Sequence, residues 1–274
     1  MKAAVASRED LDYLVFQRRI REKTGIDLSA YKRPQMERRL RSLIHQAGAE
    51  SFHHYLQLLE KSPEVMDEFR RRMTINVSEL FRNADKFEEL QAELLPELSA
   101  AADHLRIWSA GCSYGAEAYS LAILLQELSA AARRARILGT DIDDEMLARA
   151  REGVFSDADM KNVSPIRRRH FFAKTETGWR AADCLRQMME FRHHDLLTDP
   201  FERGFHLILC RNVVIYFTDE AKVGLYRRFC RSLDPRGVLF IGSTEHIFDA
   251  REMGLEPISA FFYRKTAPGD TEGD

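Results

Sequence analysis

Cysteine is scarce in this 274-residue sequence, and the cysteines that are present lie far apart. Cys112, Cys184, Cys210 and Cys230 form no CxxC pair and no Cys/His cluster with the spacing of metal ligands. The sequence therefore indicates neither a disulfide framework nor a zinc site, and we expect no bound metal.

Long apolar runs are also missing. Apolar runs such as residues 213–217 and 238–241 fall far short of the roughly 20 residues that span a bilayer, so no membrane insertion is expected. Near the start, Arg8, Glu9 and Asp10 interrupt the chain before an apolar segment typical of a signal peptide can form. We expect a cytoplasmic protein.

Neither sign of charge is in marked excess, because 41 Lys and Arg stand against 43 Asp and Glu and leave a net charge of -2. Nucleic-acid binding usually requires a strong basic excess, so no nucleic-acid partner is expected. Hydrophobic residues at 45% and charged residues at 31% are typical of globular proteins. The length fits one large domain or a small domain joined to a larger one.

The first part of the chain has a helical pattern. Apolar residues recur at intervals of three and four, beginning with Leu11, Leu14, Val15 and Ile20. We predict an all-helical N-terminal domain over residues 1–75.

This region also carries a group of arginines, Arg38, Arg39 and Arg41. They can form a solvated helix face with acidic neighbours, or a docking surface for an acidic partner. The sequence leaves both alternatives open.

From about residue 105, short apolar strands alternate with helices. The predicted strands are 105–109, 136–140, 205–210 and 238–242, and the predicted helices are 120–128, 145–151 and 222–233. This alternation is typical of an α/β fold with a parallel sheet, helices on both faces, and ligands at the carboxyl ends of the strands. We assign residues 76–274 to this domain. Its last strand, 258–265, is expected to be antiparallel because no crossover helix precedes it.

One stretch breaks the alternation. Residues 170–173 and 179–182 are two short strand candidates separated by a turn. We predict a small antiparallel β subdomain inserted at about residues 165–190.

The turn after the first predicted strand contains Gly111 and Gly115, which permit close approach of a ligand to a helix N-terminus. The next strand ends at Asp141, where a carboxylate can accept hydrogen bonds from ribose hydroxyls. We assign the ribose to Asp141 and a helix cap to Asp143. Neither GxGxxG nor GxxxxGK[ST] is present, so a nucleoside ligand without phosphates, such as S-adenosylmethionine, fits better.

Five segments in order resemble the chemotaxis receptor methyltransferases of the CheR type. They are TINVSELFR at 74–82, IWSAGCSYGAEAYS at 107–120, GTDID at 139–143, CRNVVIYF at 210–217 and GSTE at 242–245. The resemblance implies a class I S-adenosylmethionine-dependent methyltransferase domain, which is Rossmann-like, with an inserted antiparallel β subdomain and an all-α domain before it. It implies methyl transfer to the γ-carboxylate of receptor glutamates, which makes the chain a protein-glutamate O-methyltransferase that yields S-adenosylhomocysteine. The implied partner is the cytoplasmic domain of a methyl-accepting chemoreceptor, and we expect a monomer.

The resemblance also implies the site residues. The cofactor contacts fall on Asn76, Ser78, Arg82, Glu117, Asp141, Asp195, Leu196, Cys210 and Arg211, and the catalytic positions on Arg82 and Tyr216. Asp195 stands where many members have asparagine, which can donate as well as accept a hydrogen bond. By composition alone, Tyr216 reads equally as a core aromatic and Arg211 as a plain strand-end ion pair.

Two other classes of function fit the same fold. One is a regulatory module that binds S-adenosylmethionine without catalysis, against which the presence of Arg82 and Tyr216 counts. The other is a methyltransferase for a nucleic acid or a small metabolite. A nucleic-acid enzyme needs a basic groove with interleaved aromatics, which the charge balance does not support.

Overall fold

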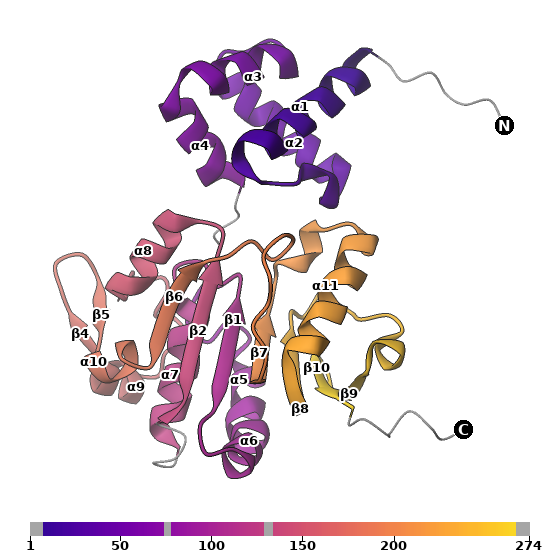
Figure 1. Ribbon diagram of the computed structural model, residues 1–274. Helices are drawn as coiled ribbons and strands as arrows, with labels where there is room; N and C mark the ends of the chain where they lie inside the picture. Colours follow the sequence, from indigo (N-terminus) through magenta and orange to yellow (C-terminus); the bar gives the residue numbers. More distant parts are fainter. Residues whose placement is uncertain (1–7, 74–77, 129–133, 267–274) are drawn as a thin grey trace. The chain divides into compact units, whose positions relative to one another are not determined.

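The structure, a computed structural model, describes residues 8–73, 78–128 and 134–266. The chain divides into two compact units (Figure 1). The helical unit comprises Met1–Ile75 together with Tyr216–Lys222, and the sheet unit comprises Asn76–Ile215 and Val223–Asp274.

The helical unit is built from four helices and one 3-10 turn over residues 8–73. Its elements are α1 (Arg8–Thr24), η1 (Leu28–Ala30), α2 (Arg33–Gln46), α3 (Phe52–Lys61) and α4 (Pro63–Met73). Local signals set their starts. The Ser51 hydroxyl accepts a hydrogen bond from the His54 backbone N–H at 3.1 Å, and proline occupies the first turn of α2.

An aromatic cluster forms the core of the helical unit. Phe16 of α1 is fully buried and lies against Phe52 and Tyr55 of α3 and Phe69 of α4, with ring centroids 5.5 to 6.4 Å apart. Such edge-on and offset contacts between rings are favourable beyond the area they bury. The cluster therefore ties α1, α3 and α4 together.

Only part of the apolar pattern that indicated α1 faces the core. Leu11, Leu14 and Val15 are 54%, 53% and 42% exposed, whereas Tyr13, Phe16 and Ile20 are buried. Both sets recur at helical spacing, and the rings fill more core volume than the aliphatic residues. Periodicity alone could not distinguish the two faces.

A seven-stranded sheet is the centre of the sheet unit (Figure 1). Its order is β6 (Met189–His193), β2 (Arg136–Asp141), β1 (Arg106–Ala110), β7 (Phe205–Cys210), β8 (Leu233–Ile241), β10 (Phe262–Lys265) and β9 (Leu255–Ser259). The first five strands pair in parallel, while β10 is antiparallel to β8 and to β9. This arrangement confirms the predicted α/β class and the antiparallel last strand.

Helices connect and cover these strands. They are α5 (Ala84–Glu89), the π-helical η2 (Leu90–Leu94), α6 (Leu95–Ala101), α7 (Ala116–Glu127), α8 (Asp144–Glu152), α9 (Pro165–Phe171), α10 (Asp183–Arg186), η4 (Val214–Tyr216), α11 (Asp219–Ser232) and η5 (Ala250–Met253). Helix α7 is buried along most of its length, including Leu121 to Leu125. It therefore belongs to the core rather than to the surface.

The inserted antiparallel sheet is present, although its elements differ from those predicted. It contains β3 (Val154–Phe155), β5 (Trp179–Ala181) and β4 (Phe172–Lys174), in that order. Residues 170 and 171 lie in α9 and not in a strand. The Ser164 hydroxyl caps α9 by accepting from the Arg167 N–H at 3.2 Å, and Pro165 stands in its first turn.

Two further differences concern the edges of the large sheet. The sequence pattern did not indicate β6, because this edge strand buries only one residue well, Phe191. The predicted strand at 258–265 is a hairpin, in which β9 ends at Ser259 and Phe261 adopts a positive φ of 77°. Edge strands expose one side and carry a weak apolar signal.

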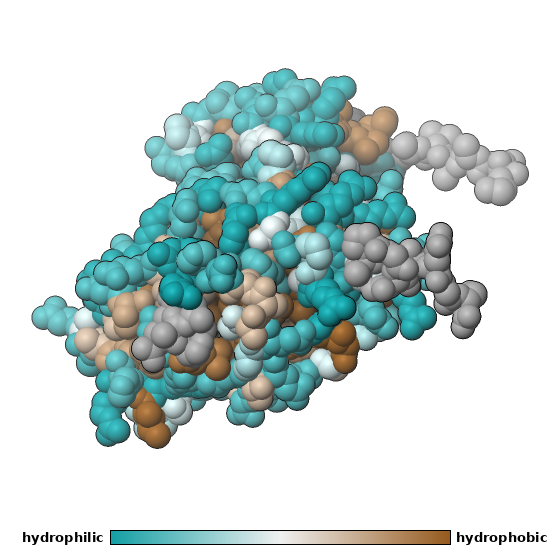
Figure 2. Space-filling view, turned by 60° about the horizontal axis from the view of Figure 1, so that its bottom comes forward, coloured by the Kyte–Doolittle hydropathy of each residue, from teal (hydrophilic) through white to brown (hydrophobic). Residues whose placement is uncertain are grey.

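The surface drawn in Figure 2 is mostly hydrophilic, with hydrophobic residues in separate small areas. Within the described ranges, no helix has the length and apolar character needed to cross a membrane.

The two faces of α1 make a direct stability test. Phe16→Ala should lower the free energy of unfolding of the helical unit by about 3 to 5 kcal/mol, because it opens a cavity among three aromatic rings. Leu14→Ala on the exposed face should change it by less than about 0.5 kcal/mol. Denaturant unfolding of both variants measures the difference, and equal losses would mean that the core face of α1 is misassigned.

Candidate functional site

Polar side chains gather at the carboxyl ends of β1, β2 and β7 in the sheet unit. Strand β1 lies between the other two, with Ala110 opposite Thr140 and Ser109 opposite Leu209. The loops that leave these parallel strands therefore meet on one side of the sheet, at the carboxyl ends of the strands.

The turn after β1 is held tightly against β2. The backbone N–H groups of Gly111 and Cys112 both donate to the carbonyl of Thr140, at 2.8 and 2.9 Å. Gly111 has φ 77°, and a Cβ there would lie 2.4 Å from Cγ2 of Val213. Only glycine meets both conditions, so this turn passes closely under the loop that follows β7.

Asp141, the predicted ribose ligand, ends β2 and is 9% exposed. Its carboxylate accepts the Ser113 N–H at 2.7 Å and the Asp143 N–H at 3.0 Å. Burial raises the pKa of Asp141, and the two N–H donors oppose that rise. A carboxylate has about four acceptor positions, so this one can also accept from hydroxyl groups. The ribose contact itself stays a prediction.

The predicted cap role of Asp143 is confirmed. Its carboxylate accepts the N–H groups of Glu145 and Met146 at 3.1 and 3.2 Å, at the start of α8. The two carboxylates of this loop thus have different partners. Asp141 binds the turn after β1, and Asp143 binds the start of α8.

Arg211 is the buried cation of this region, and its side chain is 4% exposed. Its guanidinium lies 3.3 Å from the Glu117 carboxylate and donates to the Arg82 carbonyl at 2.9 Å and to Asn83 Oδ1 at 2.6 Å. Burial lowers the pKa of Arg211, and Glu117 opposes that change. Arg211 is therefore more than a strand-end ion pair, because it links three segments of the chain.

Glu117 is held from both sides. Its Oε1 accepts the Ser109 hydroxyl at 2.7 Å, and its Oε2 faces Arg211. The residue lies in the first turn of α7, where the helix dipole favours negative charge. A carboxylate fixed in this way at a strand end is suited to an ammonium group.

The segment before α5 makes fewer polar contacts than the three loops at the strand ends. Asn76 lies outside the described residues. The Ser78 carbonyl accepts the Tyr114 hydroxyl, and the Arg82 side chain is half-buried beside the turn that Arg211 holds. The cofactor and catalytic roles of these positions stay predictions.

The loop after β6 brings Asp195 and Leu196 beside β2. The His194 N–H donates to the Asp141 carbonyl at 2.9 Å, and Asp195 Oδ1 accepts the Leu197 N–H at 2.8 Å. Arg228 of α11 holds the Leu196 carbonyl at 2.7 Å. An ionised Asp195 can only accept hydrogen bonds, and the cofactor contacts of Asp195 and Leu196 stay predictions.

Two predicted residues need separate comment. Cys210 is fully buried, and burial raises the pKa of its thiol well above the usual range, so it is no nucleophile. Tyr216 groups with the helical unit, where its carbonyl accepts the Lys32 N–H at 2.9 Å and the Arg39 guanidinium lies 5.8 Å from its ring. Its catalytic role stays a prediction.

Sequence reasoning missed three contributors. Ser109 fixes Glu117, the backbone N–H of Ser113 fixes Asp141, and Glu245 lies buried at the end of β8. Ser109 lies in the segment quoted for the resemblance, two residues before Gly111, and this position is the signal that could have identified it. The Ser113 contact uses a backbone N–H, which almost any residue type could supply, so the sequence does not indicate it.

This group of residues fits S-adenosylmethionine. Asp141 offers acceptors to a ribose, Glu117 offers a fixed carboxylate to the amino group, and the glycine turn admits a close approach. Within residues 8–73, 78–128 and 134–266 no three metal-ligating side chains gather. The strand order and this edge define the fold of a class I methyltransferase.

Comparison with known proteins gives the family. Residues 76–259 match the CheR methyltransferase, SAM binding domain, and residues 11–74 match the CheR methyltransferase, all-alpha domain. The chain belongs to the CheR methyltransferase family, and S-adenosylmethionine is its cofactor.

Full-length relatives agree with that assignment. The chain is 41% identical over 256 residues to the "Chemotaxis protein methyltransferase" of Listeria monocytogenes, covering 93% of this chain and 97% of the relative. It is 34% identical to "Chemotaxis protein methyltransferase 1" of Pseudomonas aeruginosa, covering 87% and 91%. It is 32% identical to the "Chemotaxis protein methyltransferase" of Escherichia coli, covering 83% and 81%.

The Asp141 assignment is tested by its affinity for the cofactor. Asp141→Ala should weaken S-adenosylhomocysteine binding by about 1 to 3 kcal/mol, because ribose hydroxyls would be left without acceptors. Asp144→Ala, at an exposed carboxylate in the first turn of α8, should leave the affinity unchanged. Titration calorimetry measures both affinities. If Asp141→Ala bound with wild-type affinity, Asp141 would not be the ribose ligand.

Proposed function

We propose that this protein methylates the γ-carboxylates of glutamates in the cytoplasmic helices of methyl-accepting chemoreceptors, and so adjusts receptor adaptation in chemotaxis. The observation that carries the proposal is the likeness over nearly the whole chain to relatives named chemotaxis protein methyltransferases. Both units take part in that likeness, so it extends beyond the cofactor fold.

The reaction makes modest chemical demands. A carboxylate oxygen of the acceptor forms a bond to the methyl carbon, the carbon–sulfur bond breaks, and its electron pair remains on sulfur. When bound, S-adenosylmethionine supplies the methyl group on a cationic sulfur. A glutamate has an ordinary pKa near 4.3, so the acceptor is ionised at neutral pH and needs no general base. The task of the protein is to orient and desolvate that carboxylate.

The proposed roles follow from residue chemistry. Arg82 can hold a carboxylate in bidentate fashion, either that of the acceptor or that of the methionine portion. Glu117, already fixed by Ser109 and Arg211, is suited to the cofactor's amino group. Tyr216 would direct its hydroxyl to the reacting groups.

A direct experiment is the transfer of labelled methyl from S-adenosylmethionine to a panel of receptor cytoplasmic fragments. We expect label in a receptor fragment that is released as methanol by mild base, which is the signature of a carboxyl methyl ester. Fragments with the candidate glutamates changed to alanine should take up none. Cofactor binding without transfer to any fragment would instead favour the regulatory module.

Arg82 and Tyr216 should separate binding from turnover. Arg82→Ala should weaken the cofactor and slow transfer, because a carboxylate would lose its charged partner. Tyr216→Phe should keep cofactor affinity and lower the rate by about tenfold or more, because only a hydroxyl is removed. Calorimetry measures the cofactor affinity and initial rates measure the turnover. A wild-type rate in Tyr216→Phe would mean that Tyr216 contributes only to packing.

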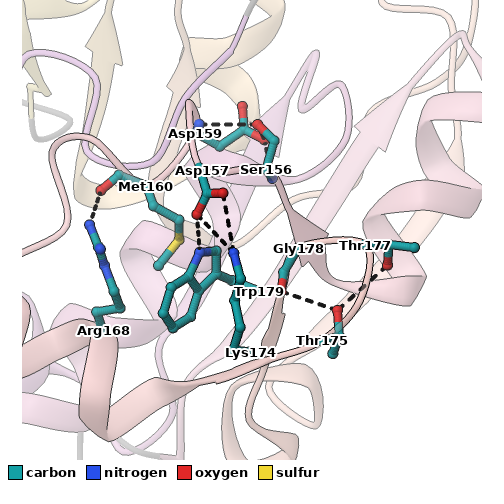
Figure 3. A network of polar contacts seen from close by, with 10 residues as sticks. All are labelled: Ser156, Asp157, Asp159, Met160, Arg168, Lys174, Thr175, Thr177, Gly178 and Trp179. Carbon is teal, nitrogen blue, oxygen red and sulfur yellow. Dashed lines mark hydrogen bonds and ion pairs between the residues drawn. The ribbon is translucent and has the colours of Figure 1, made fainter.

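The inserted subdomain bears on how the substrate is reached (Figure 3). Its β4–β5 turn is short and closes on itself, with the Thr175 N–H donating to the Gly178 carbonyl at 2.8 Å. Asp157 fixes the base of the hairpin by accepting from Trp179 Nε1 at 2.6 Å and from Lys174 Nζ at 3.0 Å. Many members of the CheR family bind the C-terminal tail of the receptor as an added strand at the edge of this subdomain. In those members the loop at this position tends to be longer and glycine-rich. We therefore propose that this protein recognises the receptor helices without a C-terminal tether.

The arginines of α2 are the proposed contact to those acidic helices. Arg38 and Arg41 are exposed, whereas Arg39 is half-buried and donates to the Met73 carbonyl at 2.5 Å. The docking alternative therefore concerns Arg38 and Arg41 and gives Arg39 a structural part. Charge at such a surface mainly raises the rate of encounter.

Receptors with and without their C-terminal tails test both ideas. Removing the tail should leave the methylation rate nearly unchanged, and raising the salt should lower it by screening the arginines. Arg38→Gln/Arg41→Gln should lose most of that salt dependence. A large loss of rate without the tail would overturn the tether-independent assignment, and a salt-independent wild-type rate would leave these arginines as a solvated face.

A further inference from the structure

A buried carboxylate stands at the end of β8, beside the proposed cofactor site. Glu245 is 7% exposed, and its Oε2 accepts the Gly242 N–H at 2.5 Å. The Glu245 N–H in turn donates to the Gly242 carbonyl at 3.0 Å, so the loop folds its own carboxylate back onto the strand end. Burying an ionisable group is costly unless it is paired, which suggests that this position has a task.

The same carboxylate reaches the neighbouring strand. The backbone nitrogen of Asn212 lies beside the same carboxylate, and its N–H lowers the pKa of Glu245. A Cβ at Gly242 would lie 2.8 Å from Glu245 Oε2 and 2.9 Å from the Asn212 nitrogen, so this position has no room for one. Since Cys210 of β7 pairs with Ile241 of β8, Glu245 fastens together the loops that leave two adjacent strands.

The conformation of Asn212 gives this contact its importance. Asn212 follows Arg211 directly and has φ 60°, in the left-handed region that most side chains avoid. Asparagine adopts this region more readily than most residues, so the residue type favours the turn and the neighbouring contacts fix it in place. The Glu245 carboxylate faces the backbone N–H of this turn, and the direction in which Arg211 leaves the strand depends on the turn.

The charged surroundings show that Glu245 and Arg211 belong to one polar group. Four side chains interact electrostatically with the Glu245 carboxylate: Arg211 just after β7, Glu117 of α7, Cys210 of β7 and Tyr226 of α11. Within the described part of the chain, Glu245 Oε1 and Arg211 Nε are buried without a hydrogen-bond partner. Arg211 thus interacts electrostatically with both carboxylates, and the Arg82 side chain adds a second positive charge nearby.

We propose that Glu245 is a positioning residue for the cofactor site: by holding the left-handed turn at Asn212, it directs Arg211 to Glu117. It acts through these residues and does not touch the reacting atoms. The proposal rests on the cofactor role given above to Arg211 and Glu117, and it requires nothing of the acceptor.

A dependence on pH follows from this geometry. Burial raises the pKa of Glu245 to about 7, with the Gly242 and Asn212 N–H groups and Arg211 opposing the rise. Burial also raises the pKa values of Cys210 and Tyr226, so both stay protonated in the neutral range. Above pH 7 the ionised carboxylate is the stronger acceptor and faces Arg211 as an anion, whereas below pH 7 it is neutral. Cofactor affinity should therefore rise from pH 6 to pH 8.

Titration with S-adenosylhomocysteine tests this proposal without any receptor. In the wild type, affinity should rise by about fivefold between pH 6 and pH 8. Glu245→Gln should bind about fivefold more weakly at pH 8 and show no such rise, because a neutral amide neither titrates nor pairs with Arg211. Glu252→Gln, at an exposed carboxylate on η5, is the matched control and should follow the wild type.

A second variant guards against misfolding of the first. Gly242→Ala keeps the glutamate at position 245, but the added methyl group displaces its carboxylate from Asn212. This variant should therefore weaken cofactor binding and flatten its pH profile in the same way. Thermal unfolding checks that both variants are folded. Wild-type affinity and pH dependence in a folded Glu245→Gln or Gly242→Ala variant would overturn the proposal, as would a flat profile in the wild type. Failure of receptor methylation alone would leave it standing.

Discussion

The buried guanidinium of Arg211 is the interaction on which the proposed site depends. A cation with 4% of its side chain exposed needs a partner, and Glu117 lies 3.3 Å away. Removing one member of a buried pair is far more damaging than replacing both, because the remaining charge is left without compensation. The rings of Phe87 and Phe240 lie 5.5 and 4.5 Å from the guanidinium and exclude water from one side. The pair therefore fixes the relative positions of β7, α7 and the turn at Arg82.

The parallel sheet explains why these groups meet. Strands β1, β2 and β7 end at the same edge, so residues from three distant parts of the sequence approach one another without any long loop. Backbone bonds then fix the details, such as the two N–H groups that hold Asp141. A carboxylate that is already oriented needs less ordering when a ligand binds.

Much of this fold could be read from the sequence, for physical reasons that also explain the failures. The inner strands are continuous apolar runs, and β7 lies where the sequence predicts it. The edge strand β6 buries one residue well and left no such run. The capping signal at Ser164 and Pro165 was present in the sequence, but the apolar Phe171 and Phe172 favoured a strand interpretation. On α1, two apolar faces share one period, and only packing selects the aromatic one.

The site divides in the same way. Asp141 could be proposed from its place at a strand end, whereas Glu117 and Arg211 were proposed from the resemblance to the CheR type. Their contacts could not be predicted: Ser113 acts through its backbone, and the GSTE segment did not show that Glu245 folds back onto the end of β8. A sequence records side chains, whereas these contacts depend on the positions of backbone atoms.

The central claim is that Arg211 and Glu117 act as one unit in holding the cofactor. A double-mutant cycle with Arg211→Met and Glu117→Gln, read by calorimetric affinity for S-adenosylhomocysteine, measures this most directly. The account predicts that each single change weakens binding strongly and that the double variant is little worse, with a coupling energy of about 1 to 3 kcal/mol. Losses that simply add, to within about 0.5 kcal/mol, would show that the two residues act independently and would contradict the account.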